Sequence, residues 1–500
     1  MSLKKNVIAN YLGQGWSALM GIAFIPLYIK YLGLEAYGLI GVFAIMQAWL
    51  TLLDMGMTPT LSREMVRYKA GAYRVESILD LLRSIEWICA ALALLIVSGI
   101  WLAAPLISSQ WLKVEKLPME TVNHAIVVMG FVMSTRLWEE VYRGAIRGMQ
   151  QQVWLNITQA TLTTLRWVGV LAVLAWISPT VQAFFLWQGL TSVISVIIYA
   201  SKTYLWLPSS QRRGKFSLDA IKGVGRFAGG IATITLLALL LTQVDKVLLS
   251  GLLSLEQFGY YTLASVVAGG LAQFITPMNA AIYPRFTELV TKHDSVALIK
   301  TYHDSCQLMS AVIVPPALVL AAFAKPVLLL WTGDHTLTNA ASPILNLLVM
   351  GTLFNGFMNV PYMLQLAHGW TGFAVRTNVV AVAIIIPAIL WAVPRYGAIG
   401  AAWIWVALNA SYVLIGIHFM YYRLIPDQKW RWYRESVARP LIAGSIVAFG
   451  LAFILPVSQK RLDCIFTLLL ASICVAASVA IVMPSLRQRI IYYTKEFLYG

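Results

Sequence analysis

Long apolar segments alternate with short polar loops along the whole chain. A helix needs about 20 apolar residues to cross a bilayer, with about 17–25 tolerated. Fourteen segments meet this requirement, so the pattern predicts an all-α polytopic membrane protein with about 14 transmembrane helices. Their approximate ranges are 6–29, 36–61, 84–107, 121–142, 153–177, 182–206, 224–252, 257–283, 303–330, 341–366, 373–393, 398–422, 437–457 and 463–484.

Composition supports the same class. Of the 500 residues 59% are hydrophobic and only 12% are charged, which leaves too little polar surface to cover a soluble globule. The first apolar segment is longer than the signal-peptide core of about 7–15 residues, and no small-residue cleavage motif follows it. We therefore expect residues 6–29 to remain as a membrane helix.

The net charge of +16 sets the expected orientation. With the N-terminus inside, 27 Lys and Arg residues fall in cytoplasmic loops or near them and 7 fall on the other side. Because cytoplasmic loops carry the excess of basic residues, both termini are predicted to be cytoplasmic. A nucleic-acid partner is not expected, since the basic residues are scattered between apolar segments and form no solvated patch with aromatic residues.

An internal repeat appears at an offset of about 221 residues. Leu34-Glu35-Ala36-Tyr37-Gly38 recurs as Leu255-Glu256-Gln257-Phe258-Gly259, and two shorter matches recur at 221 and 220 residues. Six helices per repeat is an even number, so both halves enter the membrane in the same direction and are related by an axis along the membrane normal. Two such lobes typically enclose a cavity whose access alternates, as in transporters.

The repeat predicts the domain organisation. An N-terminal six-helix lobe is expected at 1–206, a basic cytoplasmic linker at 207–223, and a C-terminal six-helix lobe at 224–424. Residues 425–500 hold two additional helices and a cytoplasmic tail outside the repeat. No loop is long enough for a soluble catalytic domain.

Motifs of catalytic chemistry are missing from the sequence. It has no Walker A pattern, no complete dinucleotide fingerprint, no HExxH and no GxSxG, so neither an enzyme nor a cofactor is predicted. The four cysteines lie in apolar segments without metal-ligand spacing, and no metal site or disulfide framework is indicated.

Charges inside the predicted helices are the remaining candidates for function, because a charge at a helix centre costs at least about 2.5–3.5 kcal/mol unless it is paired or hydrated. Arg136, Glu140, Arg143 and Arg147 are spaced by four, three and four residues and share one helical stripe. Glu140 can pair with Arg136 or with Arg143, which leaves Arg147 near the cytoplasmic mouth. The stripe is either an intrahelical ladder of ion pairs or a basic entry surface for an anionic head group.

Arg166 lies at the middle of segment five with no acidic residue within four positions. Its partner must therefore come from another helix or from substrate. A guanidinium suits bidentate phosphate binding, so Arg166 is a candidate for lining the pathway, with a buried structural ion pair as the alternative.

Asp245 and Lys246 are adjacent in segment seven and point about 100° apart around the helix, so they cannot easily satisfy each other. Lys246 is a candidate pathway residue. Asp245 is a candidate for a carboxylate that couples transport to protons, with an ion pair between helices as the alternative. Asp54, beside Gly56 and Thr58, is either a residue that joins two helices or a further coupling candidate, as is Glu140.

Several stretches carry a family resemblance. They are Gln243-Val244-Asp245-Lys246-Val247-Leu248-Leu249, the following Leu-Glu-x-Phe-Gly-Tyr-Tyr turn, Tyr31-Leu32-Gly33-Leu34-Glu35-Ala36-Tyr37-Gly38 with Leu53-Asp54-Met55-Gly56, and Trp331-Thr332-Gly333-Asp334. Together they resemble the polysaccharide transporter family, whose superfamily includes the MATE multidrug exporters and the lipid II flippases. The similarity covers essentially the whole chain, and most specifically 1–80 and 225–380.

The resemblance implies two pseudo-symmetric six-helix bundles in a V around a central cavity. It also implies an O-antigen flippase (Wzx-type) in the bacterial inner membrane, which moves an undecaprenyl-pyrophosphate-linked oligosaccharide from the cytoplasmic to the periplasmic leaflet. Arg166, Arg136, Lys246 and Arg147 would then offset the pyrophosphate charge in a basic cavity, protons or cations would supply direction, and the last two helices could serve the lipid tail. Membrane lipids and polysaccharide-assembly proteins are the other expected partners.

Three alternatives stay open. A MATE-like exporter of small organic cations would favour an acidic, aromatic cavity, whereas the candidates here are mostly basic. A lipid II-type flippase would share the architecture. A membrane glycosyltransferase or polymerase would need a long outer loop or an acidic catalytic motif, and neither is seen.

Overall fold

Helices make up most of the chain that the computed structural model describes, which is residue 13 and residues 15–69, 71, 74–207, 212, 214–455, 461–485 and 487. Within it, eleven helices are long and apolar enough to cross a membrane. Two more helices, α6 (Met119–Gly148), which carries the charged stripe, and α9 (Leu218–Leu252), are also long enough to cross and correspond to predicted segments. The helix α15 (Thr371–Ser411) bends at Gly397, and the two predicted segments at 373–393 and 398–422 lie on either side of this bend. Each predicted segment has a helical counterpart, and the all-α polytopic class is confirmed.

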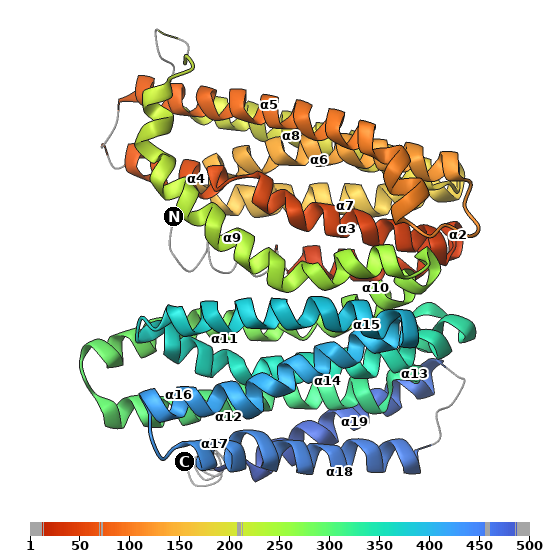
Figure 1. The fold of residues 1–500 in the computed structure, drawn as a ribbon, viewed down its shortest axis with the longest axis vertical. Coiled ribbons are helices and arrows are strands. Elements are labelled where there is room, and N and C mark those ends of the chain that lie inside the picture. Colours follow the sequence, from red (N-terminus) through yellow and green to blue (C-terminus); the bar gives the residue numbers. More distant parts are fainter. Residues whose placement is uncertain are drawn as a thin grey trace. The chain divides into compact units, whose positions relative to one another are not determined.

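The remaining elements follow in chain order (Figure 1). They are α2 (Ile25–Leu32), α3 (Leu34–Leu53), α4 (Met57–Lys69), α5 (Val75–Leu106), η1 (Ile107–Trp111), α7 (Gln152–Trp176), α8 (Val181–Trp206), α10 (Leu255–Gly269), α11 (Ala272–Thr291), α12 (Ser295–Ala322), α13 (Ala324–Thr332), α14 (His335–Ala367), η2 (Tyr412–Gly416), α16 (Ile417–Leu424), α17 (Lys429–Trp432), η3 (Tyr433–Ala438), α18 (Arg439–Ile454) and α19 (Arg461–Val482).

Several predicted crossings are built from two helices. The segment predicted at 36–61 breaks between α3 and α4, where Met55 and Gly56 have φ angles of 48° and 73°. The segment predicted at 257–283 breaks between α10 and α11, and the one at 303–330 breaks between α12 and α13. Such interruptions are tolerated at membrane depth only where the freed backbone groups meet protein or water.

The chain forms two compact units, Met1–Gly259 and Tyr260–Gly500, and the boundary lies within α10. The first unit includes α9, which packs against α3, α4 and α5. These units are defined by contacts in space, whereas the predicted lobes, with a second lobe beginning at 224, are defined by the sequence repeat. The lobe boundaries therefore stay a prediction. Most of the predicted tail, and residues 208–211 and 213 of the predicted linker, lie outside the described residues.

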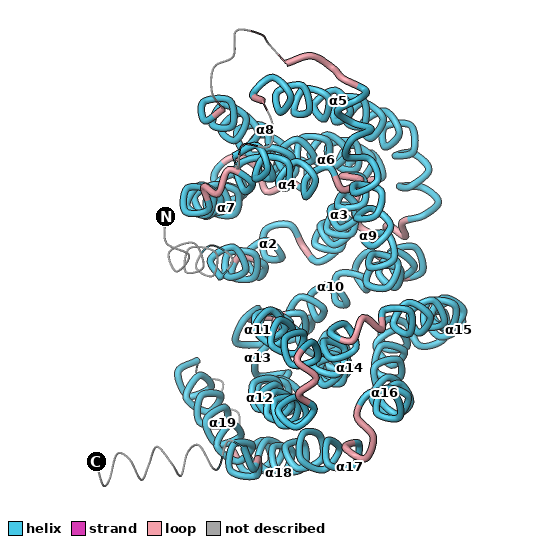
Figure 2. The backbone as a smooth tube through the Cα atoms, turned by 90° about the vertical axis from the view of Figure 1, so that its left-hand side faces the viewer, coloured by secondary structure: helices cyan, strands magenta, loops and turns pink. Residues whose placement is uncertain are grey.

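In the first unit α6 is the central helix and packs against α4, α5 and α8 (Figure 2). Its approach to α4 depends on two glycines one turn apart. A Cβ atom added at Gly144 would lie 2.8 Å from the carbonyl oxygen of Thr58, and one at Gly148 would meet that of Ser62. Small residues at this spacing let two membrane helices come close together. The close packing brings the start of α4 against the charged stripe of α6.

The repeated turn motifs contact each other within residues 1–259. A Cβ added at Gly38 would collide with the carbonyl oxygen of Leu255, and one added at Gly259 would lie 2.8 Å from that of Leu34. Since Leu255 and Gly259 follow Leu34 and Gly38 by 221 residues, the two contacts are reciprocal. We call this pair of contacts the turn pair.

Polar contacts surround the turn pair. The buried carboxylate of Glu35 accepts hydrogen bonds from the backbone N–H groups of Glu115, Lys116 and Leu117. In the second copy of the motif, Glu256 forms an ion pair with Lys116. The backbone N–H of Leu255 donates to the carbonyl oxygen of Lys113 at 3.1 Å. The loop after η1 therefore contacts both copies of the motif.

In the second unit α12 and α14 form the core, with α11 and α15 against α14 and with α18 and α19 against α12. Gln307 of α12 forms hydrogen bonds with residues next to α18 and α19, the last two helices. Its Nε2 donates to buried Glu435 at 3.3 Å, and its Oε1 accepts from the backbone N–H of Ser485 at 2.9 Å. The helices outside the predicted repeat are thus part of the second compact unit.

Candidate functional site

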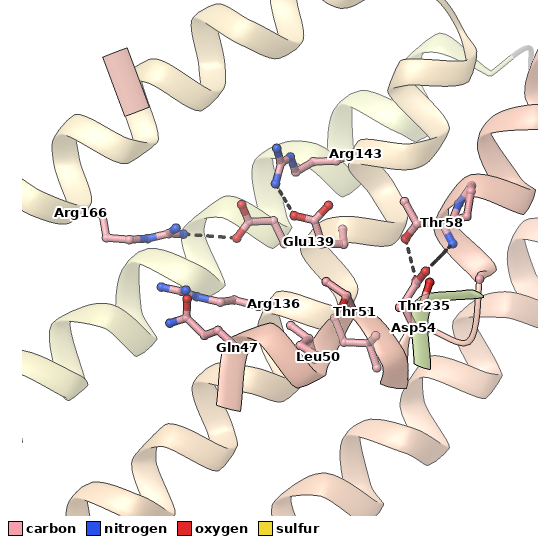
Figure 3. A pocket seen from close by; sticks show the side chains of 14 residues that line it. Gln47, Leu50, Thr51, Asp54, Thr58, Arg136, Glu139, Arg143, Arg166 and Thr235 are labelled. Atoms are coloured by element: carbon pink, nitrogen blue, oxygen red, sulfur yellow. Dashed lines mark hydrogen bonds and ion pairs between the residues drawn. The ribbon is translucent and has the colours of Figure 1, made fainter. Parts of the chain in front are cut away.

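A cavity of about 420 Å³ lies inside the first unit, beside the break between α3 and α4 (Figure 3). Its walls come from α3, α4, α6, α7 and α9, and its charged groups come from α6, α7 and the break itself. The lining residues are Gln47, Leu50, Thr51, Asp54, Gly56, Thr58, Pro59, Arg136, Leu137, Glu139, Glu140, Arg143, Arg166 and Thr235. Four of the residues predicted to carry function, Arg136, Glu140, Arg166 and Asp54, meet here.

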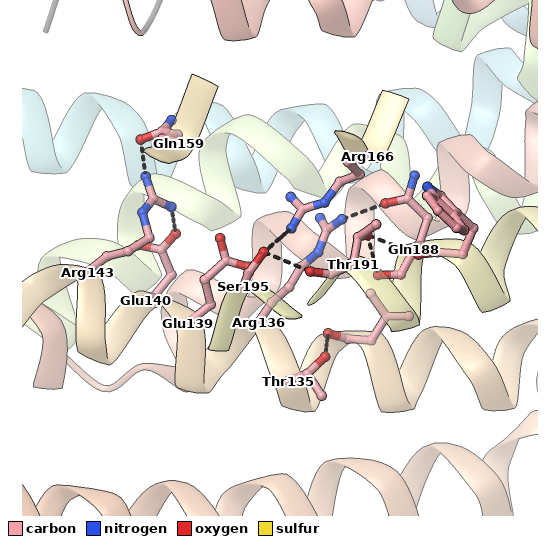
Figure 4. A network of polar contacts seen from close by, with 12 residues as sticks. Thr135, Arg136, Glu139, Glu140, Arg143, Gln159, Arg166, Gln188, Thr191 and Ser195 are labelled. Carbon is pink, nitrogen blue, oxygen red and sulfur yellow. Dashed lines mark hydrogen bonds and ion pairs between the residues drawn. The ribbon is translucent and has the colours of Figure 1, made fainter. Parts of the chain in front are cut away.

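Arg166 reaches the cavity from α7 and pairs with α6 (Figure 4). Its NH2 group lies 3.2 Å from Oε2 of Glu139, and the two side chains are only 15% and 10% exposed. It also lies 3.5 Å from the hydroxyl of Ser195 on α8. The expectation that Arg166 needs a partner from another helix is met by Glu139. The spacing of charges along the sequence does not identify Glu139 as this partner, because it lies on another helix.

Glu140 pairs with only one of its two predicted partners. It forms an ion pair with Arg143, whose guanidinium also donates to Gln159 of α7 at 2.7 Å. Arg136 instead donates to Gln188 of α8 at 3.0 Å and lies 5.2 Å from the centroid of the Phe43 ring. Within the described residues Arg136 therefore has neutral partners and no ion pair.

Three buried donors in this cavity lack acceptors. The Nε atoms of Arg136, Arg143 and Arg166 make no hydrogen bond to any described residue. A buried donor without a partner costs about 1–3 kcal/mol, and more when it is charged. The guanidinium fork is the protein group best suited to carboxylate and phosphate oxygens, so the cavity offers donors that water or an anionic ligand would satisfy.

The lining is nevertheless balanced in charge. Arg136, Arg143 and Arg166 are matched in number by three carboxylates, those of Asp54, Glu139 and Glu140. We expected a basic cavity, and the difference arises because α6 carries its acidic residues on the same face as its arginines. Any anionic ligand would have to compete with carboxylates that are already in place.

Asp54 occupies the break between the two short helices. Its carboxylate accepts hydrogen bonds from the backbone N–H of Thr58 at 3.1 Å and from its hydroxyl at 2.7 Å. These bonds satisfy the backbone donor of Thr58 in the first turn of α4, as an N-cap side chain does, although Asp54 itself lies three residues before the helix begins at Met57. Asp54 is buried, with 8% exposure, and lines the cavity together with Glu140.

The other predicted residues do not line this cavity. Arg147 is exposed near the end of α6. Asp245 and Lys246 lie on α9, beyond Thr235, and both are half-buried. Their predicted roles stay predictions. In the described part of the chain no group of three or more His, Cys, Asp or Glu residues is arranged to hold a metal ion.

Comparison with solved structures identifies the fold. The chain is similar to the lipid II flippase MurJ in an inward closed conformation, with a TM-score of 0.68, 13% identity, and coverage of 95% of this chain and 98% of that one. It is also similar to an inward-facing multidrug resistance MATE family transporter of the MOP superfamily, with a TM-score of 0.66, 14% identity, and coverage of 85% and 95%. The helical fold of these transporters is therefore shared by this chain.

Comparison with sequences identifies the family. The chain is 22% identical over 466 residues to the succinoglycan biosynthesis transport protein ExoT of Rhizobium meliloti (strain 1021), which covers 88% of this chain and 85% of that protein. The model of a family described as "Polysaccharide biosynthesis protein" matches residues 3–290, more than half of the chain and the whole of the cavity lining. This multi-pass membrane protein belongs to the polysaccharide biosynthesis protein family.

Proposed function

We propose that this protein is a flippase for an undecaprenyl-pyrophosphate-linked oligosaccharide, such as an O-antigen repeat unit. It moves the lipid-linked sugar from the cytoplasmic to the periplasmic leaflet by alternating access. The protein would lie in the bacterial inner membrane with both termini in the cytoplasm. Polysaccharide-assembly proteins would supply the substrate on the cytoplasmic side and use it on the periplasmic side.

The observation that carries this proposal is the cluster of three half-buried arginines whose buried Nε–H donors have no partner among the described residues. A pyrophosphate diester carries two charges and several exposed oxygens in a small volume, which fits three convergent guanidinium groups. The family match and the relationship to a succinoglycan transport protein support a sugar-containing substrate.

Direction of transport needs an energy source, and a gradient of protons or cations fits a chain without a nucleotide motif. Asp245, Asp54 and Glu140 are the proposed coupling candidates, and Lys246 and Arg147 are proposed to assist the passage of the anionic head group. The lipid tail would stay in the bilayer, and residues 437–484 are proposed to guide it.

Deletion of the gene tests the proposed function in cells. Deletion of the gene in a host that makes lipid-linked surface polysaccharide should abolish the surface polymer and leave the lipid-linked unit in the cytoplasmic leaflet. Normal surface polymer, in a host with no second flippase, would contradict the proposal.

The sharper test is Arg166→Ala in the complementing gene. We expect loss of most polymer export with unchanged abundance in the membrane, because a charged hydrogen bond to the ligand is worth about 1.5–3 kcal/mol, or roughly 10- to 150-fold in binding. The matched control is Arg285→Ala, since Arg285 is an exposed arginine that pairs with Glu288 on α11. Export equal to wild type in Arg166→Ala would remove Arg166 from the pathway.

An exporter of small organic cations, like the MATE transporters, is the second candidate. The three carboxylates of the cavity favour it. Against it, none of the described lining residues is aromatic, so the cavity offers a cation no ring face. Drug efflux from cells that overproduce the protein, in the absence of any polysaccharide defect on deletion, would favour this candidate.

A further inference from the structure

Two carboxylates in the cavity hold two arginines that the ligand would need. Glu139 pairs with Arg166, and Glu140 pairs with Arg143. We propose that Glu139 and Glu140 are internal counter-ions: they occupy these guanidinium groups while the cavity is empty and give them up to the phosphates of the ligand, taking up protons as they do so. The inference rests on the proposed anionic ligand and adds two residues that regulate its binding.

Uncharged side chains would hold the arginines in place when their ion pairs with Glu139 and Glu140 break. Gln159 accepts from Arg143 at 2.7 Å, and Ser195 lies 3.5 Å from Arg166. Gln188 positions Arg136 at 3.0 Å. Gln188 and Ser195 are almost fully buried, so these anchors are part of the packed wall. The guanidinium groups are therefore preorganised for a ligand, independently of their ion pairs.

Displacement leaves the carboxylates in an unfavourable setting. A buried carboxylate that loses its guanidinium partner while a diphosphate anion enters the same cavity is repelled by the new charge and poorly solvated. Glu139 is the stronger case, because its side chain is 10% exposed whereas that of Glu140 is 40% exposed. Each displaced carboxylate that protonates becomes neutral and can donate a hydrogen bond to a phosphate oxygen.

The net charge of the cavity is then zero both when it is empty and when the ligand is bound. In the empty cavity three arginines balance three carboxylates. When Glu139 and Glu140 are neutral, the three arginines and Asp54 leave a charge of plus two, which equals the charge of a pyrophosphate diester in magnitude. Both states are electrically neutral, which lowers the cost of holding the site inside the membrane.

Other charged groups near these two carboxylates are few. Asp54 faces them from the break between α3 and α4, and the uncharged Thr235 is the lining residue from α9. Tyr199 of α8 and Arg147 of α6 lie within electrostatic reach of Glu140. Protons bound with the ligand would leave with it on the outward step. An inward proton gradient therefore cannot drive that step through Glu139 and Glu140. On this inference the coupling role proposed above falls to Asp54 or Asp245 and no longer to Glu140.

Calorimetry on the purified full-length protein tests the linkage. The probe is UDP-glucose, a soluble sugar pyrophosphate diester whose phosphates do not titrate near neutral pH. Titrations in two buffers of different ionisation enthalpy give the number of protons taken up per molecule bound. We expect wild-type protein to take up one to two protons at pH 7.5, and Glu139→Gln to take up about one fewer and to bind roughly 10-fold more tightly.

Controls separate the possible failures. Glu140→Gln is a second variant at a more exposed site, in case Glu139→Gln does not fold, and it is expected to act in the same direction. Glu288→Gln, at an exposed carboxylate on α11, should leave affinity and proton uptake unchanged. One result would overturn the counter-ion role and leave the proposed function intact. In it, wild-type protein binds UDP-glucose without taking up protons, Arg166→Ala weakens the binding, and neither glutamine variant binds more tightly. Failure of wild-type protein to bind UDP-glucose would overturn the counter-ion inference, whereas the proposed function stands or falls separately with the gene deletion described above.

Discussion

Asp54 shows how one residue can serve structure and still lie in a functional cavity. It ends α3, and its carboxylate caps α4 through the backbone N–H and the hydroxyl of Thr58. A cap needs an oxygen acceptor but not a negative charge. Ion coupling, by contrast, needs a group that binds and releases the ion. The two roles proposed for Asp54 therefore respond differently to substitution.

We expect Asp54→Asn to keep the thermal stability of the purified protein, because the amide oxygen still accepts from Thr58. Asp54→Ala should lower the free energy of unfolding by about 1 kcal/mol, the usual loss when a cap is removed. Melting midpoints in detergent measure both variants. If Asp54→Asn melts like wild type but no longer exports polymer, the charge itself has a role in transport. Equal destabilisation by Asn and Ala would contradict the capping role.

Sequence predicted the charged residues of the site better than their pairings. The spacing of the stripe on α6 was sufficient to place Glu140 near both Arg136 and Arg143, and the structure pairs it with Arg143. The partnership of Arg166 with Glu139, 27 residues away, depends on how α7 is rotated against α6. Hydropathy carries no information about that rotation, so this contact could not be predicted from the sequence.

At the scale of the elements, the existence of helices followed from apolar length, but their interruptions did not. The break after Asp54 depends on two residues with positive φ, Met55 and Gly56, inside a stretch that remains apolar when averaged over a crossing. The break between α10 and α11 also lies in an apolar stretch, but none of its residues has a positive φ. Interruptions at corresponding places in two halves mark substrate sites in many transporters, and here the first one borders the cavity.

The turn pair makes Gly38 a sharp test of helix packing. Alanine normally stabilises a helix relative to glycine by roughly 0.5–1 kcal/mol. At Gly38 the added Cβ collides with the backbone of Leu255, so we expect Gly38→Ala to lower the melting midpoint, with overpacking costing about 1–3 kcal/mol.

Gly99→Ala is the matched control for this prediction. Gly99 also lies inside a helix, α5, but it is exposed and a Cβ there would meet open space. The midpoint of Gly99→Ala should stay equal or rise. A Gly38→Ala protein at least as stable as Gly99→Ala would show that the turn pair is not closely packed in solution.

At the scale of the whole molecule, the sequence predicts which loops face the cytoplasm. The basic residues place the loop before α12 inside and the loop before α6 outside. Cysteines introduced at exposed Ser295 and exposed Glu120 test this assignment. A membrane-impermeant thiol reagent that reaches the periplasm should label Glu120→Cys in intact cells and Ser295→Cys only after the inner membrane is permeabilised.

Wild-type protein gives the background for this labelling, since Cys89, Cys306 and Cys464 are buried and Cys474 is partly so. Labelling with the opposite sidedness would invert the topology. It would also place the cytoplasmic mouth predicted near Arg147 on the wrong side of the membrane for a substrate made in the cytoplasm.

The turn pair has one more consequence. Residues 34 and 38 contact residues 259 and 255, and these are the same two motif positions taken in the opposite order. Such an isologous contact has the two-fold symmetry of a homodimer interface, in which one surface serves both partners. The two copies of the motif are therefore related by a local two-fold axis, and a side chain added at either glycine meets the same backbone position of the other copy.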